Sequence, residues 1–264
     1  MRIGNRSDPP FNYTLHSTPL DHTEQEKDLG ITFDNRLKFS NHINIITKKA
    51  NSVMGIVRRC FRYIDEDIFR KLYKGIVRPH LEYGVPIWNP HFKKDIRQLE
   101  GVQRRATKQI NTIKDLSYPE RLKRLGIPTL LYRRLRGDMI EVYKVLNGKY
   151  DREVSCLLPR RITKGDQVRT RGHSRKLIKK QATRDQSKHM FTRRVVDVWN
   201  KLPERVVSAP SLYSFENRLD KHWRNLNIMY DFEATLDLLG TAAQRTDHDD
   251  VDDQDLGMED RRNQ

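Results

Sequence analysis

The 264-residue sequence predicts a mainly α-helical protein, with a small N-terminal β hairpin, a helical bundle, a second small helical segment and a disordered acidic tail. Apolar residues recur at intervals of three and four through the middle of the chain, which is the pattern of amphipathic helices. Glycine and proline stand where these patterns stop, as is typical of helix ends. The last residues are acidic and almost free of apolar side chains, which is typical of disorder.

Residues 1–40 are expected to form short β structure. Polar and apolar side chains alternate from Phe11 to Leu15, a polar turn follows at 17–19, and Asp28–Phe33 is a second apolar stretch with β-branched residues. A β hairpin or two edge strands accounts for both stretches. Asp34 follows the second stretch, where a carboxylate can bind a metal ion, but one carboxylate does not make a two-metal site.

The bundle, residues 41–148, is expected to begin with two amphipathic helices. Ser40 or Asn41 supplies the N-cap of the first helix and Asp65 that of the second. Pro79 is expected to end or kink the second helix. The expected core residues are Ile43, Ile46, Ala50, Val53, Val57 and Phe61 in the first helix, and Ile68, Leu72 and Ile76 in the second.

A buried connection from Leu81 to Trp88 is expected to lead to a third helix, which Asn89 caps and Pro90 opens. A short helix from Tyr118 to Gly126 and a longer one from Pro128 to Gly148 complete the bundle. The expected stripe of the third helix is Ile96, Leu99, Val102, Ala106 and Ile110.

Basic side chains gather opposite the apolar stripes of the first and third helices. At about 100° per residue, each of these helices buries one face and presents a cationic one. Such a surface suits a polyanion. The predicted contacts with nucleic-acid phosphates are Lys48, Arg59, Arg62, Lys94, Arg97, Arg104, Arg105 and Lys108.

Two segments follow the bundle. Residues 149–188 carry many basic and few large apolar side chains, so a basic linker is expected, which serves as a nuclear localisation signal, a phosphate-contacting arm or a merely solvated loop. Residues 189–228 are expected to form a C-terminal helical segment. Its expected core aromatics are Phe191, Trp199, Phe215 and Trp223.

The charge is unevenly distributed. The chain has 51 Lys and Arg against 35 Asp and Glu, a net charge of +16, but from Asp231 onward eleven acidic residues face three basic ones. That end therefore carries −8 and the rest carries +24. Residues 229–264 are interpreted as a disordered acidic tail, which is a solubilising end, a competitor for the basic surface or a nucleic-acid mimic.

Several classes of protein are excluded. No apolar run approaches the ~18 residues of a membrane-spanning helix, and no secretory signal begins the chain, so a nuclear or cytoplasmic location is expected. Cys60 and Cys156 are too far apart in sequence for a zinc knuckle or a disulfide framework. No phosphate-binding loop, nucleophile elbow or metalloprotease motif occurs, and His42 and His80 are interpreted as packing or capping residues. Neither an active site nor a cofactor is expected.

Seven segments, in order and spacing, resemble the C-terminal part of reverse transcriptases from non-LTR, LINE-type retrotransposons, the jockey-like group especially. The resemblance covers roughly residues 11–225. The segments are DLGITFDNRLKFSNHI from Asp28, RPHLEYGVPIWNP from Arg78, LEGVQRRATKQI from Leu99, YPERLKRLGIPTLLYRR from Tyr118, RTRGHSRKL from Arg169, FTRRVVDVWNKLP from Phe191 and the stretch from Phe215 to Asp220.

The resemblance implies that residues 1–40 are the end of a palm, with Leu29 and Gly30 in a primer-grip-like position beside the primer terminus. Residues 41–148 would be a thumb that holds an RNA/DNA template-primer duplex by its backbone. The family's palm, with its Tyr or Phe-Ala-Asp-Asp box and the Mg²⁺ ions held there, has no counterpart in this chain. Polymerase activity is therefore not carried over, because phosphoryl transfer needs two carboxylate-held metal ions.

These observations predict a nucleic-acid-binding fragment of an RNA-directed DNA polymerase, catalytically incomplete alone, from either a truncated element or a gene-model fragment. A second reading is a subunit that contacts an intact, palm-containing polymerase chain. That subunit would use Leu29, Phe33 and the segment Leu81–Trp88. A third reading is a translated relic without activity.

Overall fold

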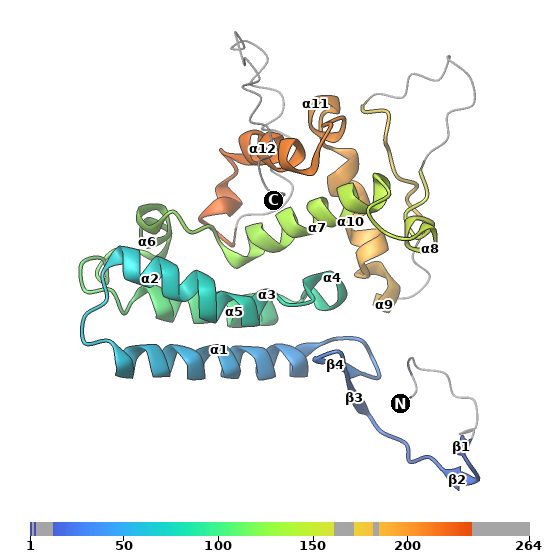
Figure 1. Cartoon of the computed structure of the whole chain (residues 1–264), viewed down its shortest axis with the longest axis horizontal. Coiled ribbons are helices and arrows are strands. Elements are labelled where there is room, and N and C mark those ends of the chain that lie inside the picture. The colour runs from blue at the N-terminus through green and yellow to red at the C-terminus, as the bar shows by residue number, and fades with distance from the viewer. Residues whose placement is uncertain (2, 4–12, 161–171, 182–184, 234–264) are drawn as a thin grey trace, which may run out of the picture.

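The computed structural model describes residues 1, 3, 13–160, 172–181 and 185–233. It confirms the mainly helical fold with N-terminal β hairpins (Figure 1). Phe11 and the acidic residues beyond Glu233 lie outside the described part of the chain.

Two short antiparallel hairpins begin the described chain: β1 (Thr14–Leu15) pairs with β2 (Thr18–Pro19), and β3 (Gln25–Asp28) with β4 (Ile31–Asp34). The sequence suggested a single apolar stretch from Asp28 to Phe33, but the structure divides it between two strands and the turn that joins them. Leu29 and Gly30 form the turn between β3 and β4, with φ of 46° and 83°. Two consecutive positive φ values are typical of the type I′ turns that close two-residue hairpins.

Helix α1 (Ser40–Cys60) begins differently from the prediction. Its N-cap is Phe39, with φ of 60°, and Ser40 instead donates its hydroxyl to Asp95 Oδ2 at 2.7 Å. The Asp34 carboxylate accepts the backbone N–H groups of Arg36, Lys38 and Phe39, at 2.7–3.0 Å. A carboxylate that holds three backbone donors is a structural cap for the chain entering α1.

The second helical run consists of α2 (Glu66–Leu72), the π-helix η1 (Tyr73–Val77) and α3 (Arg78–Glu82). Asp65 caps it as predicted, accepting the Ile68 N–H at 2.7 Å. Pro79 does not end the run, because the π turn ahead of it accommodates the missing backbone donor.

The predicted core stripe of this run was wrong by one residue. Phe69, Tyr73 and Val77 are buried, whereas Ile76 is 45% exposed. Both sets recur every four residues, and the stripe with two aromatic rings buries more apolar area.

Gly84, with φ of 67°, connects α3 to the short helix α4 (Val85–Trp88). Helix α5 (Lys93–Thr107) follows and starts three residues later than Pro90. Asn89 does not cap it, because its Nδ2 donates to Asp138 Oδ2 at 3.3 Å. The predicted stripe of α5 is largely right, since Leu99, Val102, Ala106 and Ile110 are buried.

The remaining helices are α6 (Tyr118–Leu125), α7 (Leu130–Leu146), α8 (Arg152–Ser155), α9 (Asp185–Lys188), α10 (Phe191–Asn200), α11 (Glu204–Val207), α12 (Leu212–Trp223) and the 3₁₀ turn η2 (Asn227–Met229). Gly126 ends α6 in the left-handed conformation, as expected. In Figure 1, α7 lies between the helices that follow the hairpins and the C-terminal helices α10–α12.

The described side chains form two apolar cores that divide at the start of α7. The first is built by β4 and α1 to α6 and reaches Leu130; the second starts at Tyr132 and includes α10 to η2. Leu158 and Leu177, from the segment expected to be a basic linker, are buried in this second core. Trp199, Phe215 and Trp223 are buried there as predicted, and Phe191 is partly buried against it.

Candidate nucleic-acid interface

Helices α1 and α5 pack side by side and run in the same direction. Three polar contacts between them fix this alignment, because the residue numbers of both partners increase together. The contacts are Ser40 Oγ to Asp95 Oδ2 at 2.7 Å, Gln98 Nε2 to Asn44 Oδ1 at 2.6 Å, and Arg105 Nη2 to Asn51 Oδ1 at 3.2 Å. The helices are 21 and 15 residues long.

These contacts identify the sides of the two helices that lie next to each other at the protein surface. Asn44 and Asn51 face α5, and Lys48 stands between them on the same side of α1 by helical spacing. Gln98 faces α1, and Lys94, one turn earlier, shares its side of α5. We call the resulting surface the α1–α5 face, defined by the exposed residues Lys48, Arg59, Lys94, Arg97, Arg104, Arg105 and Lys108.

Two glycines lie within this face. A Cβ placed on Gly101 would stand 3.3 Å from Arg105 Nη1, and one on Gly55 would stand 3.7 Å from Arg59 Nη1. The two guanidinium groups therefore lie over glycine backbone, where no side chain competes with them for space.

The face has no carboxylate of its own. Helix α1 contains no Asp or Glu, and the two acidic residues of α5, Asp95 and Glu100, are buried. Asp95 accepts the Ser40 hydroxyl, and Glu100 accepts the Leu131 N–H at 2.8 Å and the Tyr118 hydroxyl at 2.8 Å. The positive charge of the face is thus uncompensated by the helices that carry it.

The basic side chains of the face differ in their neighbours. Lys94 Nζ lies 5.7 Å from the centroid of the Phe92 ring, and the Arg104 guanidinium 5.6 Å from that of Tyr118, both within cation–π range. Within the part of the chain that the structure describes, Arg97 is the member that pairs with a carboxylate, that of Glu233.

Arg62, predicted to share this helical surface, lies two residues beyond the end of α1. It is exposed in the connection to α2, so helical spacing does not align it with Lys48 and Arg59. The structure therefore brings seven of the eight predicted phosphate contacts together on α1 and α5, counting the α5 C-cap Lys108, and leaves Arg62 outside the face as defined.

Leu29 and Gly30 lie elsewhere, at the β3–β4 turn. The Leu29 side chain is 79% exposed, and its carbonyl accepts the hydroxyl of Tyr83 at 3.0 Å. Tyr83 is itself 61% exposed. This hydrogen bond joins the β3–β4 turn to the stretch Leu81–Trp88, and the second reading of the sequence placed both in one docking surface.

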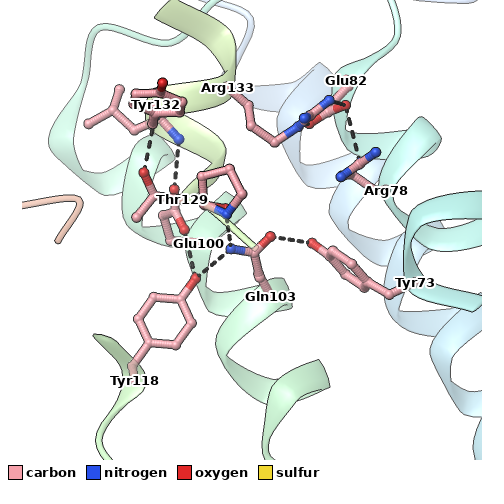
Figure 2. A network of polar contacts seen from close by, with 11 residues as sticks. Tyr73, Arg78, Glu82, Glu100, Gln103, Tyr118, Thr129, Tyr132 and Arg133 are labelled. Carbon is pink, nitrogen blue, oxygen red and sulfur yellow. Dashed lines mark hydrogen bonds and ion pairs between the residues drawn. The ribbon is translucent and has the colours of Figure 1, made fainter. Parts of the chain in front are cut away.

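A buried polar chain anchors α5 from behind (Figure 2). Tyr73 donates to Gln103 Oε1 at 2.7 Å, and Gln103 Nε2 donates to the Tyr118 hydroxyl at 3.0 Å. Tyr118 donates in turn to Glu100. Burial raises the pKa of the Glu100 carboxyl and raises the pKa of both phenols well above their usual values. The chain ties η1, α5, α6 and α7 together.

Sequence reasoning missed this polar chain, because Glu100 and Gln103 are polar residues of an amphipathic helix, and such residues are usually exposed. The available signal was their spacing of three residues, which puts both on one side of α5 close to the apolar stripe.

The interpretation of His42 as a packing residue is consistent with its surroundings. Its Nδ1 accepts the Thr32 N–H at 3.2 Å, its ring lies edge-on to Trp88 at 5.3 Å between centroids, and burial lowers its pKa. Among the described residues, no group of three His, Cys, Asp or Glu side chains is arranged to hold a metal ion. No helix in the same part of the chain is both long and apolar enough to span a bilayer.

Comparison with known proteins gives one relative of interest. The uncharacterized protein B0403.1 of Caenorhabditis elegans is 30% identical over 127 residues, which is 47% of this chain. The chain covers 64% of that protein's length. No protein-family model matches the sequence, and no solved structure matches it.

Proposed function

We propose that the chain is a nucleic-acid-binding, thumb-like fragment of the RNA-directed DNA polymerase of a non-LTR retrotransposon. In this proposal the α1–α5 face binds the backbone of an RNA/DNA template-primer duplex. The observation that carries the proposal is the acid-free face, with seven basic side chains on two parallel helices and both carboxylates of α5 buried. Backbone contacts of this kind give affinity without reading sequence.

The dimensions support a duplex as the ligand. A helix of 15 residues such as α5 is about 22 Å long at 1.5 Å per residue. Over that length, one strand of a duplex presents about six phosphates at a rise of about 3.4 Å. The basic side chains of the face are thus comparable in number to the phosphates that they would meet.

Catalysis does not belong to this proposal, because the residues that would hold the two metal ions lie in the palm of the complete polymerase. The exposed turn at Leu29 and Gly30 would take a primer-grip-like position. A second candidate function is docking to a palm-containing polymerase chain through Leu29, Tyr83 and Ile87, which are all exposed apolar side chains.

The test is a fluorescence titration of the full chain against an RNA/DNA primer-template at 50, 100 and 200 mM salt. The variant Lys48→Gln with Arg105→Gln removes one charge from each helix of the face. The matched control, Lys149→Gln with Lys201→Gln, removes two exposed charges from outside it.

We expect the face variant to bind more weakly and to reduce the slope of log K against log salt by about 2, roughly one unit for each phosphate contact removed. The control variant should keep the slope of the parent. Equal slopes for the two variants would refute the proposal. It would also be refuted if neither the parent nor a variant with asparagine in place of the six aspartates from Asp247 to Asp255 binds the duplex, and that result would favour the docking function or a relic.

A further inference from the structure

The chain returns to the α1–α5 face at the end of its described part. Glu233 accepts two hydrogen bonds from the Arg97 guanidinium, Nε to Oε1 at 3.0 Å and Nη2 to Oε2 at 3.2 Å. Phe232 lies edge-on to Tyr118, with ring centroids 6.3 Å apart. Thr129, at the start of α7, holds the approach to this contact by donating to the carbonyls of Ile228 and Met229, at 2.7 and 2.9 Å.

These contacts fix where the acidic segment begins. Residues 230–233 line a hollow of about 250 Å³ together with Arg97, Gly101, Arg104 and Tyr118. The chain therefore leaves Glu233 at the edge of the basic face and not on the far side of the protein. Arg97 is already neutralised by a carboxylate where a phosphate is expected in the proposed complex.

The segment that follows has the composition and length to cover the rest of the face. Residues 234–264 contain nine acidic and three basic residues, and six aspartates lie between Asp247 and Asp255. A random-coil link of 14 residues, the number from Glu233 to Asp247, would have a root-mean-square span of about 20 Å. That span is close to the length of α5, so a link of this length is sufficient for the aspartates to reach the basic side chains that would hold phosphates.

We propose that the acidic segment Asp247–Asp255 occupies the α1–α5 face of its own chain and competes there with polyanions. Two observations support this segment as the occupant of the face. The Arg97–Glu233 ion pair places the start of the segment at the face, and the segment and the face carry opposite charges. Because the segment is tethered, its effective concentration at the face is of the order of mM, and weak contacts suffice. The inference rests on the proposed function for the identity of the competing ligand, but docking of the segment can be measured without that ligand.

The docking experiment uses the full chain with Cys156→Ser and Gln254→Cys, so that one dye reports residue 254 and the other the exposed Cys60 at the end of α1. Energy transfer is measured at 50 mM and 500 mM salt. We expect the dyes to be closer at low salt, and this closeness to be lost in Lys48→Gln with Arg105→Gln but kept in Lys149→Gln with Lys201→Gln. Energy transfer that is the same in the parent and both variants would overturn the inference.

The competition experiment replaces the six aspartates from Asp247 to Asp255 with asparagine in the full chain. At 50 mM salt we expect affinity for the RNA/DNA duplex to rise about tenfold, and the gain to shrink as salt increases. On the Lys48→Gln, Arg105→Gln background the gain in affinity should be smaller, because the segment has lost two of its contacts on the face. A segment that changed only the overall electrostatic field would instead raise both affinities by the same factor.

The two failures are distinguishable. If the parent binds duplex through Lys48 and Arg105 but the asparagine variant gains nothing, the inference fails and the proposed function stands. If neither protein binds duplex while energy transfer still depends on Lys48 and Arg105, docking of the segment stands and the proposed function fails.

Discussion

The substitution Tyr118→Phe tests whether the buried polar chain behind α5 stabilises the fold. The hydroxyl that it removes donates to Glu100 Oε2 at 2.8 Å and accepts from Gln103 Nε2 at 3.0 Å (Figure 2). Both partners keep other contacts: Glu100 still accepts the Leu131 N–H, and Gln103 still binds the Pro128 carbonyl and the Tyr73 hydroxyl. The substitution therefore weakens two buried groups without removing all their partners.

A hydrogen bond to a charged group contributes about 1.5–3 kcal/mol and a neutral one about 0.5–1.5 kcal/mol. We therefore expect Tyr118→Phe to lower the free energy of unfolding by about 2–4 kcal/mol, measured by urea titration and fluorescence of the buried Trp88. The matched control is Tyr83→Phe, which removes an exposed hydroxyl bonded to the Leu29 carbonyl and should cost less than about 0.5 kcal/mol.

The effect should also depend on pH. Burial raises the pKa of Glu100 in the folded protein above its value of 4.5 in the unfolded chain, so the contribution of this group to stability is lost as the pH rises through that interval. Without the Tyr118 donor the folded pKa rises further, and the cost of the substitution should grow above pH 4.5. Equal costs for Tyr118→Phe and Tyr83→Phe at pH 7 would refute the assignment of Glu100 and Tyr118 as a stabilising pair.

Three further changes test the frame around the site by urea unfolding. Gly84→Ala should lower the free energy of unfolding by about 2 kcal/mol or more, because the φ of 67° disfavours a side chain and a Cβ would lie 2.7 Å from Ile31 Cδ1. The control Gly137→Ala, where a Cβ meets nothing within 4 Å, should be neutral or stabilising. Equal effects of the two substitutions would contradict the argument. Asp34→Ala should lower the free energy of unfolding by about 1–2 kcal/mol, because three backbone N–H groups lose their acceptor. An unchanged unfolding midpoint would show that these groups find other partners. Burial raises the pKa of Tyr132 to about 12, and it also raises the pKa of Tyr73 and Tyr118, so above pH 10 the unfolded chain loses these protons first and stability should fall. Tyr132→Phe should make this fall shallower by about 1.4 kcal/mol per pH unit between pH 10 and pH 12, and an unchanged slope would contradict the burial of its hydroxyl.

Local signals in the sequence predicted the helices well, and long-range packing explains the errors. Asp65 and Gly126 act where capping chemistry predicts, because a cap depends only on residues within one turn. The stripe Ile68, Leu72 and Ile76 failed because a second stripe of the same spacing was available, and only packing against α1 and α5 selects between them. The π turn ahead of Pro79 has no sequence signature of its own.

The candidate face was predicted as two separate cationic surfaces, and periodicity cannot say how two helices meet. Their parallel alignment depends on Asn44 and Asn51 bonding to Gln98 and Arg105, residues about 54 positions apart in the chain. Periodicity also assumed that Arg62 continued the helix, although α1 ends at Cys60.

The arrangement of charge within α5 argues against an ordinary solvated surface. A helix that is merely soluble mixes both signs on its exposed side, where Asp or Glu gains from neighbouring Lys or Arg one turn away. In α5 both carboxylates point inward, and burial is costly enough to raise the pKa of Glu100 despite its hydrogen bonds. The fold thus accepts buried carboxylates on one side of the helix, while the carboxylate that pairs with the exposed side, that of Glu233 on Arg97, comes from outside α5. Buried carboxylates and neighbouring like charges both disfavour stability. Together, however, these two features keep the α1–α5 face positive, as a site for a polyanion requires.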